Sequence, residues 1–526
     1  MGPRDARVTA GQSIMTAPNP IPATQGGMAH VAVAGTGWAT GQAIASKLVT
    51  LVATWVIARN LSAEEVALAT LAMTVTKFLC VLPPLNMGDL LIAHRRSLAW
   101  LRPIAVRIGF RWGWGITIGS IALAPLIARY YSNFPTVLLT ALLMTAAFRP
   151  LSESMQVVPL TALRLSFRNR TIAIVDGTVQ LVAAIATIVL AVLGAGPWAM
   201  VAPLIGSFAL KALGYRLAQG GTEAEDAAPS WTGSHARKAG ALVQRRFFTT
   251  GGAQYVHSLI DTLPLLILGK LSTESETGLF GFSVTLAAQA NTVIAAQIAG
   301  VLQPVLGHLG QDPVRQTSGY LRAMRMLSAV AVPICLCQAA FSETLFSVFI
   351  RGDLRAAAPV FAALSLSEAF YFASAPTMAM LRAQGRFGTF LAWQAAHLGA
   401  VLVVLPLAAH WGGAMPVAIA IAGLWSISLP IAVWITTRPV GGSLWSAARL
   451  FTAPWITGLP IAALAWFGAR SMVSLGTGAQ LATLALGAPL TCLLMLLSTR
   501  LVQPDAYLEM RSIAVRMIER VRRRGR

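Results

Sequence analysis

Apolar segments, each long enough to cross a lipid bilayer, follow one another along almost the whole of this 526-residue chain. A transmembrane helix needs about 20 mostly apolar residues. Hydrophobic residues make up 56% of the chain and charged residues 11%, whereas a soluble domain carries about 25% charged residues. The composition therefore excludes a soluble globular protein. It predicts an all-α polytopic membrane protein.

The hydrophobic pattern predicts about fourteen transmembrane helices. We place them at 35–58, 66–91, 104–128, 136–158, 171–193, 197–215, 247–269, 278–306, 323–342, 359–381, 387–409, 414–436, 446–469 and 478–499. The polar residues 1–34 that precede them lack the continuous apolar core of a signal peptide. We expect these residues to form a disordered cytoplasmic amino terminus.

Positive charge alternates between the two sides of the predicted membrane protein. The loops after even-numbered helices, together with both termini, hold 28 Lys and Arg residues, whereas the loops after odd-numbered helices hold six. Cytoplasmic loops carry such an excess, so both termini are expected in the cytoplasm. The net charge of +21 is then explained by contact with anionic membrane lipids, and we expect no nucleic-acid partner.

Landmarks of the first half of the chain recur in the second half. Leu61-Ser62-Ala63-Glu64 follows the first predicted helix and Leu271-Ser272-Thr273-Glu274 follows the seventh; Gly196-Pro197 opens the sixth and Gly413-Ala414 opens the twelfth. Each repeat holds six helices, an even number, so the two repeats share one orientation and are related by a pseudo-two-fold axis along the membrane normal. The sequence thus predicts two six-helix lobes.

The domain plan follows from these repeats. We expect a first lobe at 35–216, a cytoplasmic linker at 217–246, a second lobe at 247–437 and two extra helices at 446–500. Residues 501–526 alternate apolar residues with arginines, which is typical of a basic amphipathic helix that lies on the inner leaflet.

Three short motifs stand at helix ends in the predicted first lobe. They are Ala58-Arg59-Asn60-Leu61-Ser62-Ala63-Glu64-Glu65, Leu163-Arg164-Leu165-Ser166-Phe167-Arg168, and Gly194-Ala195-Gly196-Pro197-Trp198-Ala199-Met200-Val201. Together they resemble the oligosaccharide and polysaccharide flippases (Wzx-like, polysaccharide transporter family) of the multidrug/oligosaccharidyl-lipid/polysaccharide exporter superfamily. Ala63 stands where that family usually has proline. The resemblance covers about residues 35–437.

This resemblance implies a function. The chain would move an oligosaccharide linked to undecaprenyl diphosphate from the inner to the outer leaflet of the bacterial cytoplasmic membrane, by alternating access, for surface polysaccharide synthesis. Polysaccharide polymerase and export machinery are the implied protein partners. The implied energy source is antiport of a proton or sodium ion, with no other cofactor. A polar head group needs such a path, because each unpaired polar group costs several kcal/mol in hydrocarbon.

Charges inside the predicted helices are the candidates for substrate contact, because a charge at the bilayer centre costs about 2.5–3.5 kcal/mol on insertion scales. Lys47, Lys77 and Arg149 lie within first-lobe helices, and their side chains could neutralise a diphosphate. Each has an alternative: Lys47 could pair with a carboxylate across the lobe interface, Lys77 could pair or reach the membrane surface, and Arg149 could pair with Glu153 four residues on.

The second lobe carries charges of the opposite sign. Asp261 lies within the seventh predicted helix and Glu368 within the tenth, while Gln394 and His397 share one face of the eleventh. The family resemblance implies that these four residues form an ion-coupling site. Asp261 could instead pair with a first-lobe lysine.

Two other functions stay open, a multidrug exporter of the same superfamily and a membrane glycan polymerase or ligase. The chain has no glycine-rich phosphate loop and no Cys/His spacing typical of a metal site, so we expect no catalytic and no metal-binding residues. The largest predicted outer loop, at about 343–358, is short for a catalytic domain. Its Arg351, Asp353 and Arg355 are the residues that an enzyme would use.

Overall fold

The computed structural model describes residues 46, 49–80, 98–166, 168–219, 255–289, 306, 309, 312–509 and 511–512. All regular secondary structure in these residues is helical, which confirms the all-α prediction. Helical residues overlap each of the fourteen predicted segments, and eight of the described helices are long and apolar enough to cross a membrane. The number of crossings stays a prediction. The amino terminus 1–34, the residues 220–246 of the linker and the tail residues 513–526 lie outside the described residues.

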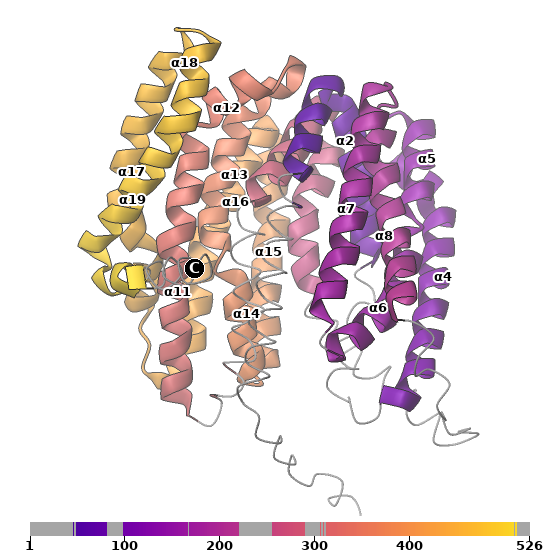
Figure 1. Cartoon of the computed structure of the whole chain (residues 1–526), viewed down its shortest axis with the longest axis horizontal. Coiled ribbons are helices and arrows are strands. Elements are labelled where there is room, and N and C mark those ends of the chain that lie inside the picture. The colour runs from indigo at the N-terminus through magenta and orange to yellow at the C-terminus, as the bar shows by residue number, and fades with distance from the viewer. Residues whose placement is uncertain are drawn as a thin grey trace, which may run out of the picture.

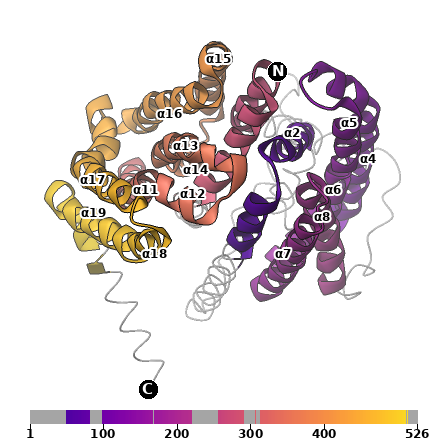
Figure 2. The same ribbon diagram turned by 90° about the horizontal axis from the view of Figure 1, so that it is seen from above.

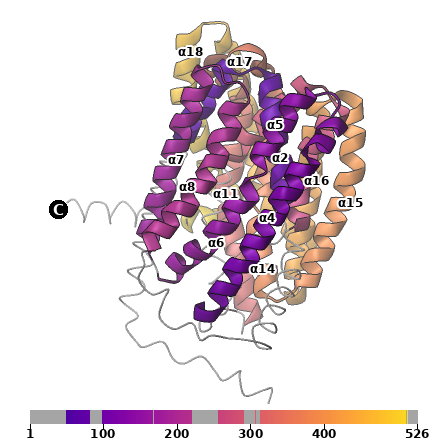
Figure 3. The ribbon, with the colours of Figure 1, turned by 90° about the vertical axis from the view of Figure 1, so that its right-hand side faces the viewer.

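The first bundle is formed by the first half of the chain. It contains a helix at 49–60, α2 (Ala63–Cys80), α4 (Leu98–Tyr130), α5 (Thr136–Ala146), α6 (Arg149–Leu165), α7 (Asn169–Val192) and α8 (Trp198–Gln219). Helix α6 packs between α4 and α8, and α7 packs on α8. The helices run side by side along one direction (Figure 3).

The second bundle stands beside the first (Figures 1 and 2). It contains helices at 255–271 and 274–289, then α11 (Pro313–Ala340), α12 (Ser342–Phe349), α13 (Ala358–Tyr371), α14 (Ser374–Ala383), α15 (Phe387–Gly412) and α16 (Ala414–Thr437). Helix α13 packs against α11 and α16.

The last two predicted spans pack on the second bundle. They are α17 (Leu444–Val473) and the pair α18 (Thr477–Ala482) and α19 (Ala488–Val502), which a π-helical turn joins. Both contact α11, on the side away from the first bundle (Figure 2). Leu486 in the π-helical turn and Leu501 in α19 are 73% and 82% exposed. Because such a large apolar surface suits lipid and not water, the protein is a multi-pass membrane protein.

One predicted helix in each bundle is broken near its middle. The segment predicted at 136–158 divides into α5 and α6, and the segment at 359–381 divides into α13 and α14. Pro150 and Pro376 explain the breaks, because a proline lacks the N–H that would bond to the residue four before it and its ring clashes with that carbonyl. Broken helices at membrane depth are tolerated where they are covered by protein or line a cavity.

The two bundles contact each other at one end through residues 61–65, 130–134 and 270–278. We call this contact the outer junction, after the side of the membrane that the sequence predicts for these loops. Lys270 Nζ donates to the Tyr130 carbonyl over 2.6 Å, and Asn133 Nδ2 donates to the Ser272 carbonyl over 2.9 Å. A Cβ added at Gly278 would lie 1.8 Å from the carbonyl oxygen of Ala63. Only glycine therefore permits this approach of the two backbones.

Acidic groups also meet at the outer junction. The pKa of Glu274 is raised, first by burial and then by the nearby charge of Glu64. The Glu274 carboxyl is therefore protonated more easily at this junction than an exposed glutamate would be.

The repeated sequence landmarks contact each other within each bundle. Ser62 and Glu65 cap α2 reciprocally, with Ser62 N donating to Glu65 Oε2 over 2.9 Å and Glu65 N donating to Ser62 Oγ over 3.2 Å. The carboxylate of Glu65 also lies against Gly196, where an added Cβ would be 2.8 Å from Oε1. The turn after the first helix therefore fits against the turn that opens α8.

The second bundle repeats this arrangement. Glu276 N donates to Thr273 Oγ1 over 3.3 Å, and the Glu276 Oε2 accepts from Ala414 N over 2.7 Å at the start of α16. A carboxylate at a helix amino terminus is favourable. Glu276 thus corresponds to Glu65, one residue out of register with the alignment that pairs Leu61 with Leu271.

Replacing Glu276 with Ala should lower the free energy of unfolding by about 0.5–2 kcal/mol, the usual cost of losing a helix cap. Unfolding of the detergent-purified protein measures this change. Asp353→Ala is the matched control, because the Asp353 carboxylate has no ion-pair or hydrogen-bond partner among the described residues. Equal losses in the two variants would contradict the assigned cap.

The start of the predicted tail is attached to the second bundle. Glu509 pairs with Arg322, and Asp505 Oδ2 lies 3.7 Å from Arg325 Nη1. Both arginines belong to the first half of α11. The tail therefore begins at the arginine-rich end of the molecule.

Candidate functional site

A cavity of about 400 Å³ lies between the two bundles. From the first bundle, α2 supplies Thr70, Met73, Thr74 and Lys77 to its wall, and the second bundle supplies the rest. A Cβ at Gly281 would lie 2.7 Å from Thr70 Oγ1, so the bundles are in close contact beside the cavity. The volume falls in the range of roughly 300–1,000 Å³ that is usual for ligand sites.

The cavity is bordered at both ends. The outer junction lies beyond α2's first turn, and toward the other end the ring of Phe78 contacts that of Tyr255, with centroids 5.7 Å apart. Since Phe78 belongs to the first bundle and Tyr255 to the second, this aromatic contact also joins the two bundles.

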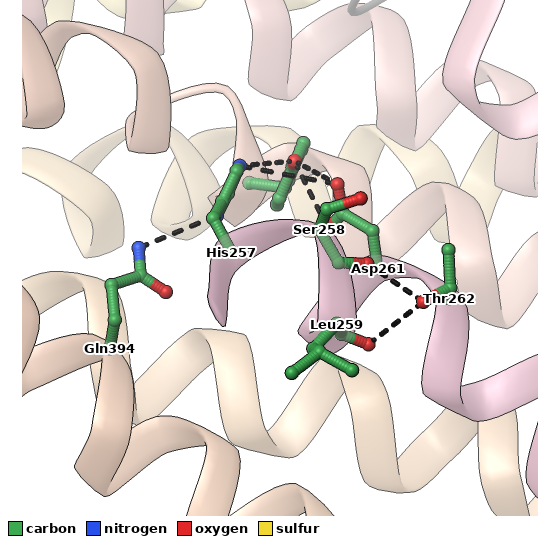
Figure 4. Close-up of polar contacts among 7 residues, drawn as sticks. His257, Ser258, Leu259, Asp261, Thr262 and Gln394 are labelled. Carbon is green, nitrogen blue, oxygen red and sulfur yellow. Dashed lines mark hydrogen bonds and ion pairs between the residues drawn. The ribbon is translucent and has the colours of Figure 1, made fainter. Parts of the chain in front are cut away.

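Three polar side chains meet on the second-bundle wall. His257 and Asp261 are four residues apart and therefore share one face of their helix (Figure 4). The Tyr371 hydroxyl donates to Asp261 and lies 3.3 Å from each carboxylate oxygen. It also lies 3.4 Å from His257 Nε2, which is 4.0 Å from Asp261 Oδ2. A carboxylate, an imidazole and a phenol thus form one connected group that can hold and move a proton.

Helix α15 extends this group with Gln394 and His397. Gln394 Nε2 lies 3.4 Å from His257 Nδ1 (Figure 4). His397 stacks on Trp425 with a centroid separation of 4.2 Å, and Trp425 meets Tyr371 edge-on at 4.9 Å. We call these four residues, together with His257 and Asp261, the polar cluster.

Two atoms of the polar cluster lack partners. Gln394 Oε1 and His397 Nε2 are buried and have no hydrogen-bond partner among the described residues. A buried polar atom left unpaired costs about 1–3 kcal/mol, so these two atoms are candidates for binding a proton, an ion or water.

The opposite wall of the cavity carries a cation. Lys77 lines the cavity from α2 and makes no ion pair with any residue that the structure describes. Asp261 and Glu368 line the same cavity from the second bundle. The Lys77 side chain is exposed and unpaired among the described residues, so its ammonium is available to an anionic group in the cavity.

Comparison with known proteins now identifies the family. A family model described as polysaccharide biosynthesis protein matches residues 56–353, more than half of the chain. The chain belongs to the polysaccharide biosynthesis protein family. It is also 22% identical over 349 residues to the succinoglycan biosynthesis transport protein ExoT of Rhizobium meliloti (strain 1021), a match that covers 65% of this chain and 66% of that protein, slightly under two thirds of its length.

Solved structures share the fold of this polysaccharide biosynthesis protein. The lipid II flippase MurJ in an inward closed conformation matches with a TM-score of 0.64 and 12% identity, over 87% of this chain and 97% of that one. An inward-facing multidrug MATE transporter of the MOP superfamily matches with a TM-score of 0.51 and 14% identity, over 79% and 94%. These similarities show a shared fold, and the family match confirms the resemblance to the polysaccharide family that was drawn from the sequence.

The structure brings most of the predicted site residues of this family member together. Lys77, Asp261, Glu368 and His397 line one cavity, and Gln394 reaches it through His257. Lys47 lies outside the described residues.

Arg149 does not line the cavity between the bundles, where the sequence predicted it. Its Nε lies 2.8 Å from Glu153 Oε1, and its guanidinium covers the ring of Phe208 at 4.7 Å. The pairing within α6, which is the alternative that the sequence left open, is what the structure shows. The sequence predicted several cations in the cavity. Among the described residues that line it, Lys77 is the only lysine or arginine.

Sequence reasoning missed Tyr371 and Trp425. Tyr371 follows Glu368 by three residues on the same helix face, and that spacing is the signal that could have suggested it. Aromatic residues within apolar segments usually serve packing, so neither residue stood out.

Proposed function

We propose that this protein is a flippase that moves an oligosaccharide linked to undecaprenyl diphosphate from the inner to the outer leaflet, for surface polysaccharide or exopolysaccharide synthesis. The family match and the similarity to a transport protein of succinoglycan biosynthesis support this function. The observation that carries it is the charged cavity between two bundles, with Lys77 on one wall and the polar cluster on the other. We propose no catalytic step.

The cavity gives a polar head group a path that hydrocarbon denies. In this proposal the diphosphate binds Lys77 through charge-assisted hydrogen bonds, the sugar lies in the cavity, and the lipid tail stays in the bilayer. Lys47 is proposed as a second phosphate contact. The lobes at 35–216 and 247–437 are proposed to move as two units about the linker 217–246.

Alternating access then has two sets of contacts to exchange. The outer junction joins the bundles at one end of α2, and the Phe78–Tyr255 contact joins them toward the other. We propose that the aromatic contact opens to admit substrate from the cytoplasmic side and that the junction opens to release it. Both termini are proposed to be cytoplasmic and the membrane to be the bacterial inner membrane, from the arginine-rich loops.

The polar cluster is proposed to couple transport to an ion gradient. A proton suits it better than sodium, because hard cations prefer several oxygen ligands, whereas His257 and His397 offer imidazole nitrogens to the cluster. Proton binding at Asp261 would remove a negative charge from the cavity that Lys77 also lines, so the lysine's charge would be balanced by the diphosphate. Glu368 is proposed to contribute the second negative charge.

Deleting the gene tests the proposed function. Loss of a flippase should stop polysaccharide export and cause lipid-linked repeat units to accumulate in the inner leaflet, where mass spectrometry of extracted lipids identifies the sugar. A multidrug exporter would leave lipid-linked intermediates at the normal level and raise drug sensitivity on deletion, which would contradict the proposal.

Alanine at Arg351, Asp353 and Arg355 together should leave most export activity intact. These residues are exposed on the short helix at Gly352–Ala357 and beside it, outside the proposed path. Export is measured as polysaccharide released by the complemented deletion strain. Loss of polymer with lipid-linked units already in the outer leaflet would instead indicate a polymerase or ligase.

A further inference from the structure

The first bundle holds a second cavity of about 380 Å³, between α4, α6 and α8. It shares no lining residue with the cavity between the bundles. Arg102 and Arg216 line it from α4 and α8, and Ser154 and Val158 line it from α6. By the distribution of arginines, this cavity stands at the cytoplasmic side of the membrane.

The cavity follows from how α4 crosses α6. The two helices come close at Gly113, where an added Cβ would lie 2.4 Å from Ser154 Oγ. One turn earlier, a Cβ at Gly109 would lie 3.8 Å from the Ser154 carbonyl. The helices therefore separate toward the amino end of α4, and the last turn of α8 borders the space that opens.

The charges at this cavity lack counterions. Neither Arg102 nor Arg216 has an ion-pair partner in the described part of the chain, and no carboxylate is among the described residues that line the cavity. The carboxyl end of α8 favours the charge of Arg216, but Arg102 lies near the amino end of α4, where the helix dipole favours no cation. Two guanidiniums with the Gln219 amide form a set of donors that matches a phosphate group.

An apolar path leads away from this set of donors. Val106 and Phe110 line the cavity and are 42% and 47% exposed. Trp114 and Ile118 continue the row at four-residue spacing and are also exposed, so all four lie on one face of α4. A ligand that fits has a phosphate beside the arginines and an acyl chain along α4.

We propose that this cavity binds the phosphate head group of an anionic phospholipid from the inner leaflet. Basic pockets between helices on the cytoplasmic side are suited to such head groups. The site is separate from the proposed transport path, so it stands whether or not the chain is a flippase.

The test uses the full chain in detergent from which lipid has been removed. Adding phosphatidylglycerol should raise the unfolding temperature, whereas phosphatidylcholine should have a much smaller effect. In Arg102→Gln/Arg216→Gln the apparent affinity for phosphatidylglycerol should fall about 30-fold, since each arginine contributes about 1 kcal/mol near an anionic surface. Val158→Phe, which fills the cavity and keeps both arginines, should weaken binding as well.

Arg107→Gln/Arg111→Gln is the matched control. It removes two exposed charges from the same end of α4, and neither residue lines the cavity. Equal weakening in the control and the cavity variant would overturn the proposal, because only general surface charge would then be involved. The proposal would also be overturned if inorganic phosphate raised the unfolding temperature as much as phosphatidylglycerol does. It would be overturned as well if a lipid-linked diphosphate raised the unfolding temperature and phosphatidylglycerol did not.

Discussion

Transport of the lipid-linked oligosaccharide is expected to fall roughly 5–150-fold when Asp261 is replaced with Asn, the range of a typical coupling free energy of about 1–3 kcal/mol. Asparagine keeps the size of the side chain and can still accept from the Tyr371 hydroxyl, so the fold should be retained. The negative charge opposite Lys77 is lost, and with it the response of transport to a proton gradient. Flipping in proteoliposomes with and without an imposed pH gradient measures both effects.

Tyr371→Phe gives the graded comparison for Asp261. It removes only the hydroxyl that joins Asp261 to His257 and keeps the ring against Trp425. We expect a smaller loss of rate with gradient dependence partly kept. Asp261→Asn protein that transports at the normal rate and still responds to the gradient would remove Asp261 from the coupling site.

Gly278→Val should open the outer junction. A side chain at this position meets the Ala63 backbone carbonyl, which cannot move aside as a flexible side chain can. Overpacking of this kind costs about 1–3 kcal/mol, enough to move the population away from the junction-closed state by about 5–150-fold. A cysteine at Thr74, which lines the cavity, should then react faster with a membrane-impermeant maleimide added outside cells whose native cysteines have been replaced.

Gly119→Val serves as the control for the junction. An added Cβ at Gly119 meets nothing within 4 Å, so valine there is open to the surroundings of α4. In the Gly119→Val protein, the cysteine at position 74 should be labelled as fast as the same cysteine in the protein that keeps Gly119. If Gly278→Val is folded and its labelling is also unchanged, the outer junction does not control access to the cavity.

The sequence predicts the helices well because hydropathy and length are local properties. The helix expected at 171–193 is observed at Asn169–Val192. The one expected at 104–128 is longer, at Leu98–Tyr130, because a helix continues past the apolar stretch that hydropathy detects. The break between α5 and α6 was missed because Pro150 alone does not determine whether a helix kinks or stops.

The candidate site was only partly predictable. Asp261 and Glu368 stand out because a carboxylate in an apolar segment is rare. Arg149 stands out equally, yet its spacing to Glu153 fits both a local ion pair and a role in the cavity. Only the structure distinguishes these two possibilities. The contact of Gln394 with His257 joins residues 137 positions apart. It depends on how α15 packs against the helix at 255–271, which no local pattern encodes.

Direct observation of flipping tests the central claim that the cavity between the bundles carries the head group across the membrane. The labelled lipid-linked oligosaccharide recovered from the deletion strain is placed in proteoliposomes, and its exposure to a membrane-impermeant reagent is followed. Exposure should be fast with the unchanged protein and slow with Lys77→Gln, while Arg107→Gln, outside the cavity, should match the unchanged protein. Exposure at the protein-free rate with the unchanged protein, or equal rates with and without Lys77, would contradict the account.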